Sequence, residues 1–305
     1  TYDGVISDIK GIAQLVHSFG IPLIVDQAHG AHFGMHPDYP ANAVSEGADL
    51  VIHSVHKTLP APTQTALIHR NGELTDGELL RRYLRIYQSS SPSYLLMAGI
   101  DEAVSFAERE GKSRLESLLI WRDSFLREME GCRNIYICPL TEPGKLVICV
   151  KGSSMTGQKL YDVLRDKYHL QMEMAAGNYV VAILTMMDQE KGLRRLSAAL
   201  QEIDLKMPDL DLGCGRRDWQ WTNLCPHIER NLWEAYQMPY EEVVLEEAEG
   251  RTAAEFINLY PPGIPLLVPG ERVEKRLTGL VCAYLSQGYN VQGICNNRIK
   301  VLINA

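Results

Sequence analysis

The chain has 305 residues, a formal net charge of −8, and 46% hydrophobic and 22% charged residues, which is typical of a globular protein. The negative charge argues against nucleic acid as a partner, and the apolar runs are too short and interrupted to span a membrane. Thr1 leads into an amphipathic pattern rather than a signal peptide, and seven cysteines without disulfide-framework spacing favour reduced thiols, so we expect a cytoplasmic protein. Cys214, Cys225 and His227 do not reproduce a zinc spacing, so no metal site is predicted.

The first part of the chain predicts alternating helices and strands. Apolar residues at helical spacing predict a helix from Val5 to Val16 that ends at Gly20. Three short apolar runs predict strands, the first a buried parallel strand that ends at Asp26 and the second a strand followed by His53 to Thr58. The three runs are residues 22–25, 48–52 and 65–68.

The second part predicts a different arrangement. A long helix is expected from Asp101 to Met129, and Gly131 ends it. The later elements expected are strand 146–150, helix 157–166, strand 179–184, helix 189–205, loop 208–226, acidic helical stretch 241–249, turn 260–265, a helix from 272 and edge strand 299–303. We therefore predict an α/β fold with two domains, residues 1–130 and 131–305.

Two residues at the ends of predicted strands indicate a chemistry. Asp26 ends the first strand and Lys57 follows the second, and ligands collect at the carboxyl ends of strands in open α/β sheets. A lysine can bond to the aldehyde of pyridoxal phosphate as a Schiff base, while an aspartate keeps the pyridine nitrogen protonated. The pair therefore predicts a pyridoxal-phosphate site, although a lysine after a strand is often a surface residue and an aspartate there is often a turn residue.

The neighbouring residues extend this prediction. Ala28 offers a small side chain that can pack against the cofactor ring, and Ser54 offers a hydroxyl to the phosphate. His29 and His56 can donate hydrogen bonds to the ring hydroxyl or the phosphate, although each histidine taken singly is more often structural.

Five segments together form a distinctive pattern: TYDG (1–4), VDQAHGAHFG (25–34), SVHKTLPA (54–61), SSSPSYLLMAGID (89–101) and EGRTAAEFINLYPPGIPLLVPGE (249–271). In these segments the chain resembles the Orn/Lys/Arg decarboxylases, pyridoxal-phosphate enzymes of the aspartate-aminotransferase fold type. The resemblance is greatest to the shorter members, which lack a receiver-like domain. It implies that residues 1–130 are the C-terminal part of a fold type I large domain and that residues 131–305 are a C-terminal α+β domain.

The resemblance also implies residue roles. Lys57 is the Schiff-base lysine, Asp26 faces the pyridine nitrogen, and Ala28 lies against the ring. His29 lies near the ring hydroxyl, and Ser54 and His56 approach the phosphate. Lys57, Asp26 and His56 are the expected catalytic residues, with Lys57 or a nearby histidine returning a proton to the substrate. Ser90 and Ser91 are expected to reach the cofactor of a neighbouring subunit, which implies a homodimer or a higher homo-oligomer.

The implied reaction is decarboxylation of arginine, lysine or ornithine to its amine, as in polyamine biosynthesis. In the family the cofactor domain begins well before the TYDG segment, so we expect this chain alone to have little activity and an exposed sheet edge that favours aggregation. One alternative is another enzyme of the same fold type, such as an aminotransferase. A second alternative is a non-catalytic, truncated paralogue that acts as a structural or regulatory subunit.

Overall fold

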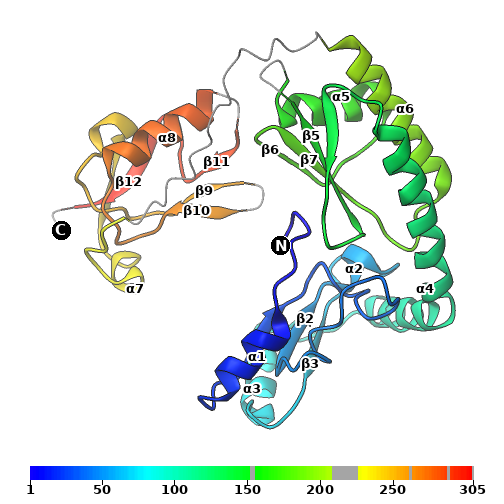
Figure 1. Ribbon diagram of the computed structural model, residues 1–305. Helices are drawn as coiled ribbons and strands as arrows, with labels where there is room; N and C mark the ends of the chain where they lie inside the picture. Colours follow the sequence, from blue (N-terminus) through cyan, green and yellow to red (C-terminus); the bar gives the residue numbers. More distant parts are fainter. Residues whose placement is uncertain (152–154, 208–225, 261–262, 287–288, 304–305) are drawn as a thin grey trace. The chain divides into compact units, whose positions relative to one another are not determined.

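The computed structural model describes residues 1–151, 155–207, 226–260, 263–286 and 289–303 (Figure 1). The chain divides into two compact units. Unit 1 comprises Thr1–Glu173 and Asn178–Leu210, and unit 2 comprises Met174–Gly177 and Asp211–Ala305. The expected boundary at residue 130 falls inside unit 1. Cys214, Cys225 and nearly all of the expected loop 208–226 lie outside the described residues.

Unit 1 begins with α1 (Ile9–His17) and a three-stranded sheet in the order β1-β2-β3. The Asp8 side chain caps α1 by accepting a hydrogen bond from the Gly11 backbone. β1 (Ile24–Asp26) pairs in parallel with β2 (Leu50–His53), and β2 pairs antiparallel with β3 (Leu67–Arg70). The three strands expected here are confirmed.

The expected burial of the first strand is wrong. β1 lies at the edge of its sheet and pairs with β2 alone, and the Ile24 side chain is 60% exposed. A continuous apolar run is typical of a strand covered on both faces. In the described part of unit 1, neighbouring elements do not cover both faces of β1, so its side chains stay partly exposed.

A buried carboxylate fixes the start of this sheet. Asp49 is 4% exposed, and its Oδ2 accepts hydrogen bonds from the Leu23 backbone at 2.7 Å and from the His17 ring at 2.8 Å. Asp49 also donates its own backbone N–H to the Leu23 carbonyl. These contacts join the end of α1 to the starts of β1 and β2.

Three helices follow the strands of this sheet. The short α2 (Val55–Thr58) comes directly after β2. The sequence did not predict α3 (Gly77–Tyr87), which has strong amphipathic character but buries none of its residues. The long helix α4 (Tyr94–Met129) begins at Tyr94 rather than at the expected Asp101, because the Ser93 side chain caps it.

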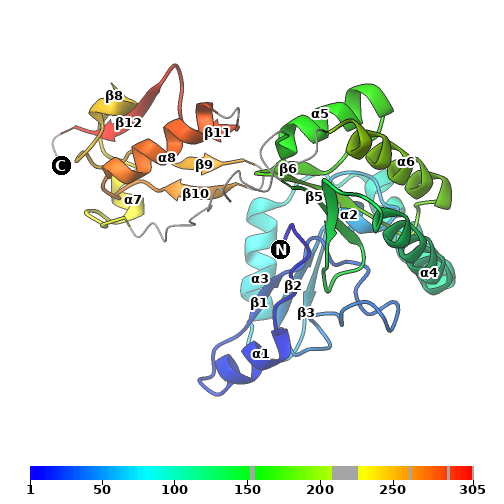
Figure 2. The ribbon, with the colours of Figure 1, turned by 45° about the horizontal axis from the view of Figure 1, so that its top comes forward.

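A second, antiparallel sheet of unit 1 contains β4 (Ile135–Cys138), β5 (Lys145–Val150) and β7 (Tyr179–Ile183). All six residues of β5 are buried. α5 (Gly157–Tyr168) packs against β7, and α6 (Glu190–Lys206) runs beside α4 in both views (Figures 1 and 2). The core of this layer includes Leu118, Phe125, Ile135, Leu146, Ile148, Leu160, Leu164, Leu196 and Leu200. β4 was not predicted from the sequence.

The carboxylate of Asp204 joins α6 to the start of β4. Its Oδ1 accepts hydrogen bonds from the backbone of Asn134 and Ile135 at 2.6 and 2.8 Å, and its Oδ2 accepts one from Arg133 at 2.9 Å. Asp204 is almost fully buried, so no bulk water can replace it.

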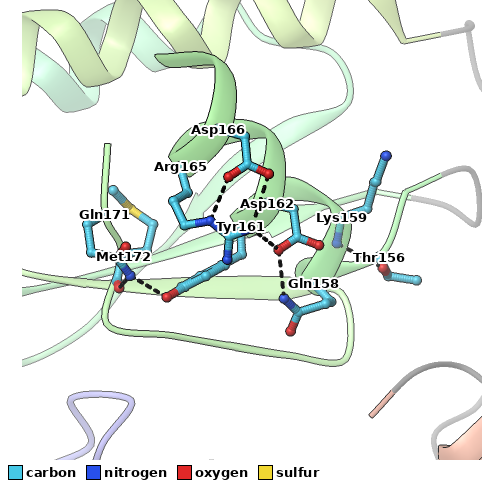
Figure 3. A network of polar contacts seen from close by, with 9 residues as sticks. All are labelled: Thr156, Gln158, Lys159, Tyr161, Asp162, Arg165, Asp166, Gln171 and Met172. Atoms are coloured by element: carbon cyan, nitrogen blue, oxygen red, sulfur yellow. Dashed lines mark hydrogen bonds and ion pairs between the residues drawn. The ribbon is translucent and has the colours of Figure 1, made fainter. Parts of the chain in front are cut away.

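The outer face of α5 is polar (Figure 3). Thr156 caps the helix by accepting a hydrogen bond from the Lys159 backbone, and Arg165 forms ion pairs with Asp162 and Asp166. These groups are exposed, so each pair contributes little to stability. The polar side chains instead fix how α5 is oriented. Its polar face stays in solvent, and Leu160 and Leu164 face the core.

In its described residues, unit 2 contains small antiparallel sheets and a helix of 12 residues. β9 (Ile257–Leu259) lies between β10 (Ile264–Leu267) and β11 (Val291–Gln292), and β12 (Arg298–Leu302) pairs with β8 (Tyr240–Val244). α8 (Lys275–Ser286) packs on them through a shared core. The other short elements are β6 (Met174–Ala176) and α7 (Leu232–Ala235). The core includes Leu245, Ile257, Leu267, Leu277, Val281, Ile299 and Val301.

The expected helix over residues 241–249 is wrong. These residues form most of strand β8 and then a 3₁₀ turn, Leu245–Glu247. Pairing with β12 places Val243 opposite Ile299, and Leu245 enters the core. Glu241 forms an ion pair with Arg251, and Glu246 accepts hydrogen bonds from the Asn297 side chain. Tertiary pairing therefore outweighs the helix propensity of glutamate.

Among the described residues, no helix combines the length and the apolar character needed to cross a membrane.

We predict that Asp204→Ala lowers the free energy of unfolding by about 3 kcal/mol, because three N–H groups lose their shared acceptor. Urea unfolding would measure the change. The matched control is Asp123→Ala on α4, whose carboxylate is 64% exposed and whose removal should change stability by less than about 0.5 kcal/mol. Equal stability of the two variants would contradict the role of Asp204.

Candidate active site

The parallel pairing of β1 and β2 brings two loops to one edge of the sheet. Asp26 is the last residue of β1 and lies opposite Ile52 in the register, so the chain leaves both strands at the same edge. Asp26 Oδ1 accepts a hydrogen bond from the Ala28 backbone at 3.0 Å, which turns the chain after β1. The loop after β1 and α2 after β2 therefore face a common space.

Lys57 projects from α2 toward the loop after β1. Its Nζ lies 3.1 Å from Nε2 of His29 and 5.5 Å from the centroid of the Tyr2 ring. The Tyr2 and His29 rings are in contact, with centroids 4.4 Å apart. Lys57 is thus held by an imidazole and an aromatic face, and it is not a free surface residue.

A second lysine, which sequence reasoning missed, lies on the other side of His29. Lys145 is the first residue of β5 and is 2% exposed, with its Nζ 2.9 Å from His29 Nδ1. Gly4 has a φ of +82° and leaves room for this side chain, because a Cβ there would lie 3.0 Å from Cβ and Cγ of Lys145. The signal in the sequence was a lysine directly before the apolar run 146–150.

These groups line a pocket of about 540 Å³. Asp26, Ala28, His29 and Lys57, all expected from the sequence, lie together in its wall. The unpredicted part of the wall includes Tyr2, Glu46, Glu142 and Lys145. The structure therefore brings together four of the six predicted site residues.

The other two predicted residues, Ser54 and His56, are not among the residues that line this pocket. Ser54 precedes α2 and makes no side-chain capping bond. The His56 ring donates from Nδ1 to the Thr65 carbonyl at 2.9 Å, since a carbonyl can only accept. In neutral His56, Nε2 therefore carries no proton and can only accept a hydrogen bond. His56 could donate from Nε2 to a phosphate only when its ring is charged.

Ser90 and Ser91, the residues expected to reach a neighbouring subunit, are exposed in the connection between α3 and α4. The Ser91 carbonyl accepts a hydrogen bond from the Ser89 hydroxyl at 3.1 Å. Neither residue lines the pocket.

A buried polar chain supports the loop after β1. The Gln27 side chain accepts hydrogen bonds from the Ala43 backbone at 3.3 Å and from His53 Nε2 at 2.8 Å. His53 Nδ1 lies 3.0 Å from His69 Nε2 on β3. The loop that carries Ala28 and His29 is therefore tied to both β2 and β3.

The pocket environment shifts two protonation equilibria. Burial, with the charges of Lys145 and Lys57, lowers the pKa of His29 to about 3, so the ring is neutral at pH 7. Burial also lowers the pKa of Lys145, against the opposing effect of Glu142 and Glu173. Two amines and a neutral imidazole are thus in contact in one pocket.

A comparison of the sequence with models of protein families gives two matches. Residues 1–188 match the family model described as "Orn/Lys/Arg decarboxylase, major domain". Residues 229–292 match the "Orn/Lys/Arg decarboxylase, C-terminal domain". The chain belongs to the Orn/Lys/Arg decarboxylase family.

Members of the Orn/Lys/Arg decarboxylase family are also similar over nearly the whole chain. Arginine decarboxylase of Bacillus subtilis is 31% identical over 304 residues, which cover 96% of this chain and 62% of the relative. The structure of the constitutive lysine decarboxylase of Escherichia coli superposes with a TM-score of 0.80 at 20% identity, covering 99% of this chain and 57% of that chain. The chain thus spans about three fifths of the length of these relatives.

The fold class expected from the sequence is confirmed. The neighbours are the lysine decarboxylases and, more distantly, fold type I enzymes such as ureidoglycine-glyoxylate aminotransferase of Bacillus subtilis. The latter has a TM-score of 0.52 at 15% identity and covers 69% of this chain and 60% of that chain.

We predict that acid destabilises the protein through its buried histidines. The pKa of His29 is lowered to about 3, and burial beside His69 lowers that of His53 to about 4. An unfolded histidine titrates near 6.5, so below that pH the unfolded state binds protons that the folded state does not. The free energy of unfolding should therefore fall as the pH decreases from about 6.5 toward 4.

Urea unfolding at a series of pH values tests this prediction. His29→Gln should weaken the pH dependence in that window, whereas the exposed His227→Gln should leave it unchanged. The imidazole resonances of His29 should stay constant between pH 5 and 8. A His29 titration centred near pH 6.5 would contradict the prediction.

Proposed function

We propose that this chain carries the catalytic site of a pyridoxal-phosphate-dependent decarboxylase that converts arginine, lysine or ornithine to its amine. One observation carries the proposal: the Lys57 amine and the Asp26 carboxylate line one pocket in a member of the Orn/Lys/Arg decarboxylase family. Lys57 and Asp26 are the proposed catalytic residues.

The pocket residues fit the cofactor. Lys57 would hold the aldehyde, and Asp26, oriented by the Ala28 backbone, would face the pyridine nitrogen. The short Ala28 side chain leaves the pocket open beside the ring, and His29 lies next to Lys57. The phosphate contacts of Ser54 and His56, and a catalytic role for His56, stay predictions, because neither side chain lines the pocket.

When bound, pyridoxal phosphate supplies a sink for the electron pair that carbon dioxide leaves behind. Asp26 would stabilise this sink by keeping positive charge on the ring nitrogen. His29, neutral at pH 7, contacts Lys57 through Nε2 and so can exchange a proton with the amine. Lys57 or a histidine would then return a proton to the carbon that has lost its carboxylate.

The wall of the pocket supports a cationic substrate. Besides Asp26, the acidic residues Glu46 and Glu142 are among those that line it. Arginine, lysine and ornithine all carry a distal positive charge that a carboxylate can bind. B. subtilis arginine decarboxylase and E. coli lysine decarboxylase bear names that fit this substrate class.

The proposal includes a homodimer. α3 buries none of its residues, and large apolar side chains are exposed on α3 and at the start of α4. They are Leu79, Tyr83, Ile86, Tyr87, Tyr94 and Leu95. Exposed groups of this kind mark association surfaces. Sedimentation of the purified chain as a monomer at micromolar concentration would contradict this part of the proposal.

An aminotransferase-like reaction is the second candidate. The structural similarity to ureidoglycine-glyoxylate aminotransferase favours this reaction. However, the structure of that enzyme superposes on a smaller part of this chain than the structures of the lysine decarboxylases do. The two reactions differ in one product, because decarboxylation releases carbon dioxide and amino transfer yields an oxo acid.

The decisive experiment supplies the purified chain with pyridoxal phosphate and carboxyl-labelled arginine, lysine or ornithine. We expect slow release of labelled carbon dioxide from one of them, because this chain alone is expected to have little activity, and Asp26→Ala should reduce even this rate at least about a hundredfold by weakening the electron sink. Asp38→Ala, which removes an exposed carboxylate, is the matched control. An oxo acid without carbon dioxide would favour the aminotransferase, and a near-normal rate for Asp26→Ala would contradict its role.

A further inference from the structure

Tyr2 is an aromatic residue of the pocket wall to which the proposed reaction assigns no role. The centroid of its ring lies 4.4 Å from that of the His29 ring, with an angle of 60° between the planes, and 5.5 Å from Lys57 Nζ. Lys57 Nζ also lies 3.1 Å from His29 Nε2. The Tyr2 ring therefore contacts both the amine and the imidazole beside it.

A tight turn fixes the position of Tyr2. The Gly4 backbone N–H donates to the Thr1 carbonyl at 3.2 Å, and the Val5 backbone N–H donates to the Thr1 hydroxyl at 3.1 Å. Gly4 closes this turn with a φ of +82°, a conformation that glycine adopts without steric cost. The ring of Tyr2 is thus held over the pocket by its own backbone.

An aromatic ring acts differently on the two forms of an amine. The face of the ring carries partial negative charge and attracts a cation within about 6 Å of its centroid, whereas a neutral amine gains little from the same contact. Lys57 Nζ is within this range of the Tyr2 ring. The ring therefore favours the charged form of Lys57.

The other groups around Lys57 are compatible with this charge. His29 is neutral at pH 7, because burial lowers its pKa to about 3. A charge on Lys145 opposes one on Lys57, but the pKa of Lys145 is lowered, chiefly by burial, which weakens the opposition. Three acidic residues are among those that line the pocket, namely Asp26, Glu46 and Glu142.

We propose that Tyr2 is a positioning residue whose ring holds Lys57 in its charged form beside His29. A lysine donates a proton only from this form. One N–H bond of Lys57 can then break, its proton forms a C–H bond with the electron pair on the carbon that has lost its carboxylate, and Lys57 is left as a neutral amine. This consequence rests on the proposed function, whereas the effect of the ring on Lys57 does not.

Chemical labelling of the chain without cofactor or substrate tests the proposal. Trinitrobenzene sulfonate reacts only with neutral amines, and mass spectrometry of peptides reports the labelling rate of Lys57. Tyr2→Leu removes the aromatic face, so more of Lys57 is neutral at pH 8 and it should label about threefold faster. Tyr2→Phe should label like the wild type, because it keeps the aromatic face.

The pH dependence of labelling separates an effect on charge from simple cover by the ring. An ordinary lysine is about half neutral near pH 10.4, so the threefold difference between Tyr2→Leu and the wild type should fall below about 1.5-fold at pH 10.5. If the ring only covered Lys57, the difference would be the same at both pH values. That result, or equal or slower labelling of Tyr2→Leu at pH 8, would overturn the proposal.

The matched control is Tyr136→Leu. The centroid of the Tyr136 ring lies 5.6 Å from Lys151 Nζ, and neither residue lines the pocket. This variant loses a similar contact elsewhere and should leave Lys57 labelling unchanged, so an equal acceleration in both leucine variants would overturn the proposal. Because the assay contains no pyridoxal phosphate, failure of the proposed function would not affect its outcome.

A second measurement on the wild-type chain does not depend on the folding of any variant. Nuclear Overhauser effects report protons that lie within about 5 Å of one another. We expect cross peaks between the ring protons of Tyr2 and the ε-methylene protons of Lys57 at pH 7. Their absence would show that the ring does not hold the amine and would overturn the proposal.

Discussion

The parallel pairing of β1 with β2 is the constraint on which the site depends. It ends both strands at the same edge of the sheet, so the loop with Ala28 and His29 faces the short helix with Lys57. Asp49 fixes the start of these strands, and the chain of Gln27, His53 and His69 fixes the loop. If this register moved by one residue, the side chains of β1 would change faces.

The second constraint is electrostatic. Two lysines meet one imidazole, and one of them, Lys145, is almost fully buried, so the three groups cannot all be charged at low cost. Burial keeps His29 neutral, so the ring can connect the two amines without adding a charge. The second sheet of unit 1 therefore takes part in the site, because β5 supplies Lys145.

The sequence predicted the elements with strong local patterns. The apolar strands β2, β5 and β7 and the long α4 were expected, and so were four residues of the pocket wall. β8 was predicted as helix because its pairing with β12, far along the chain, has no local signal. Lys145 was missed for a similar reason, since its contact with His29 joins two sheets that are distant in sequence. Local patterns show which segments fold, but not which of them come together.

The roles of Ser54 and His56 illustrate a further limit of the pattern. Both lie close to Lys57 in sequence, yet Ser54 precedes α2 and His56 turns toward the Thr65 carbonyl. Nearness along the chain did not place them in the pocket wall. Their position shows why contacts to a phosphate need to be established separately from contacts to the reactive amine.

The most direct test of this account is a titration of the purified chain with pyridoxal phosphate, followed by visible absorption. The account predicts a band from a covalent adduct that is lost in Lys57→Ala and kept in Lys151→Ala. An equally strong band in Lys57→Ala would contradict the assignment of Lys57 as the amine that holds the cofactor.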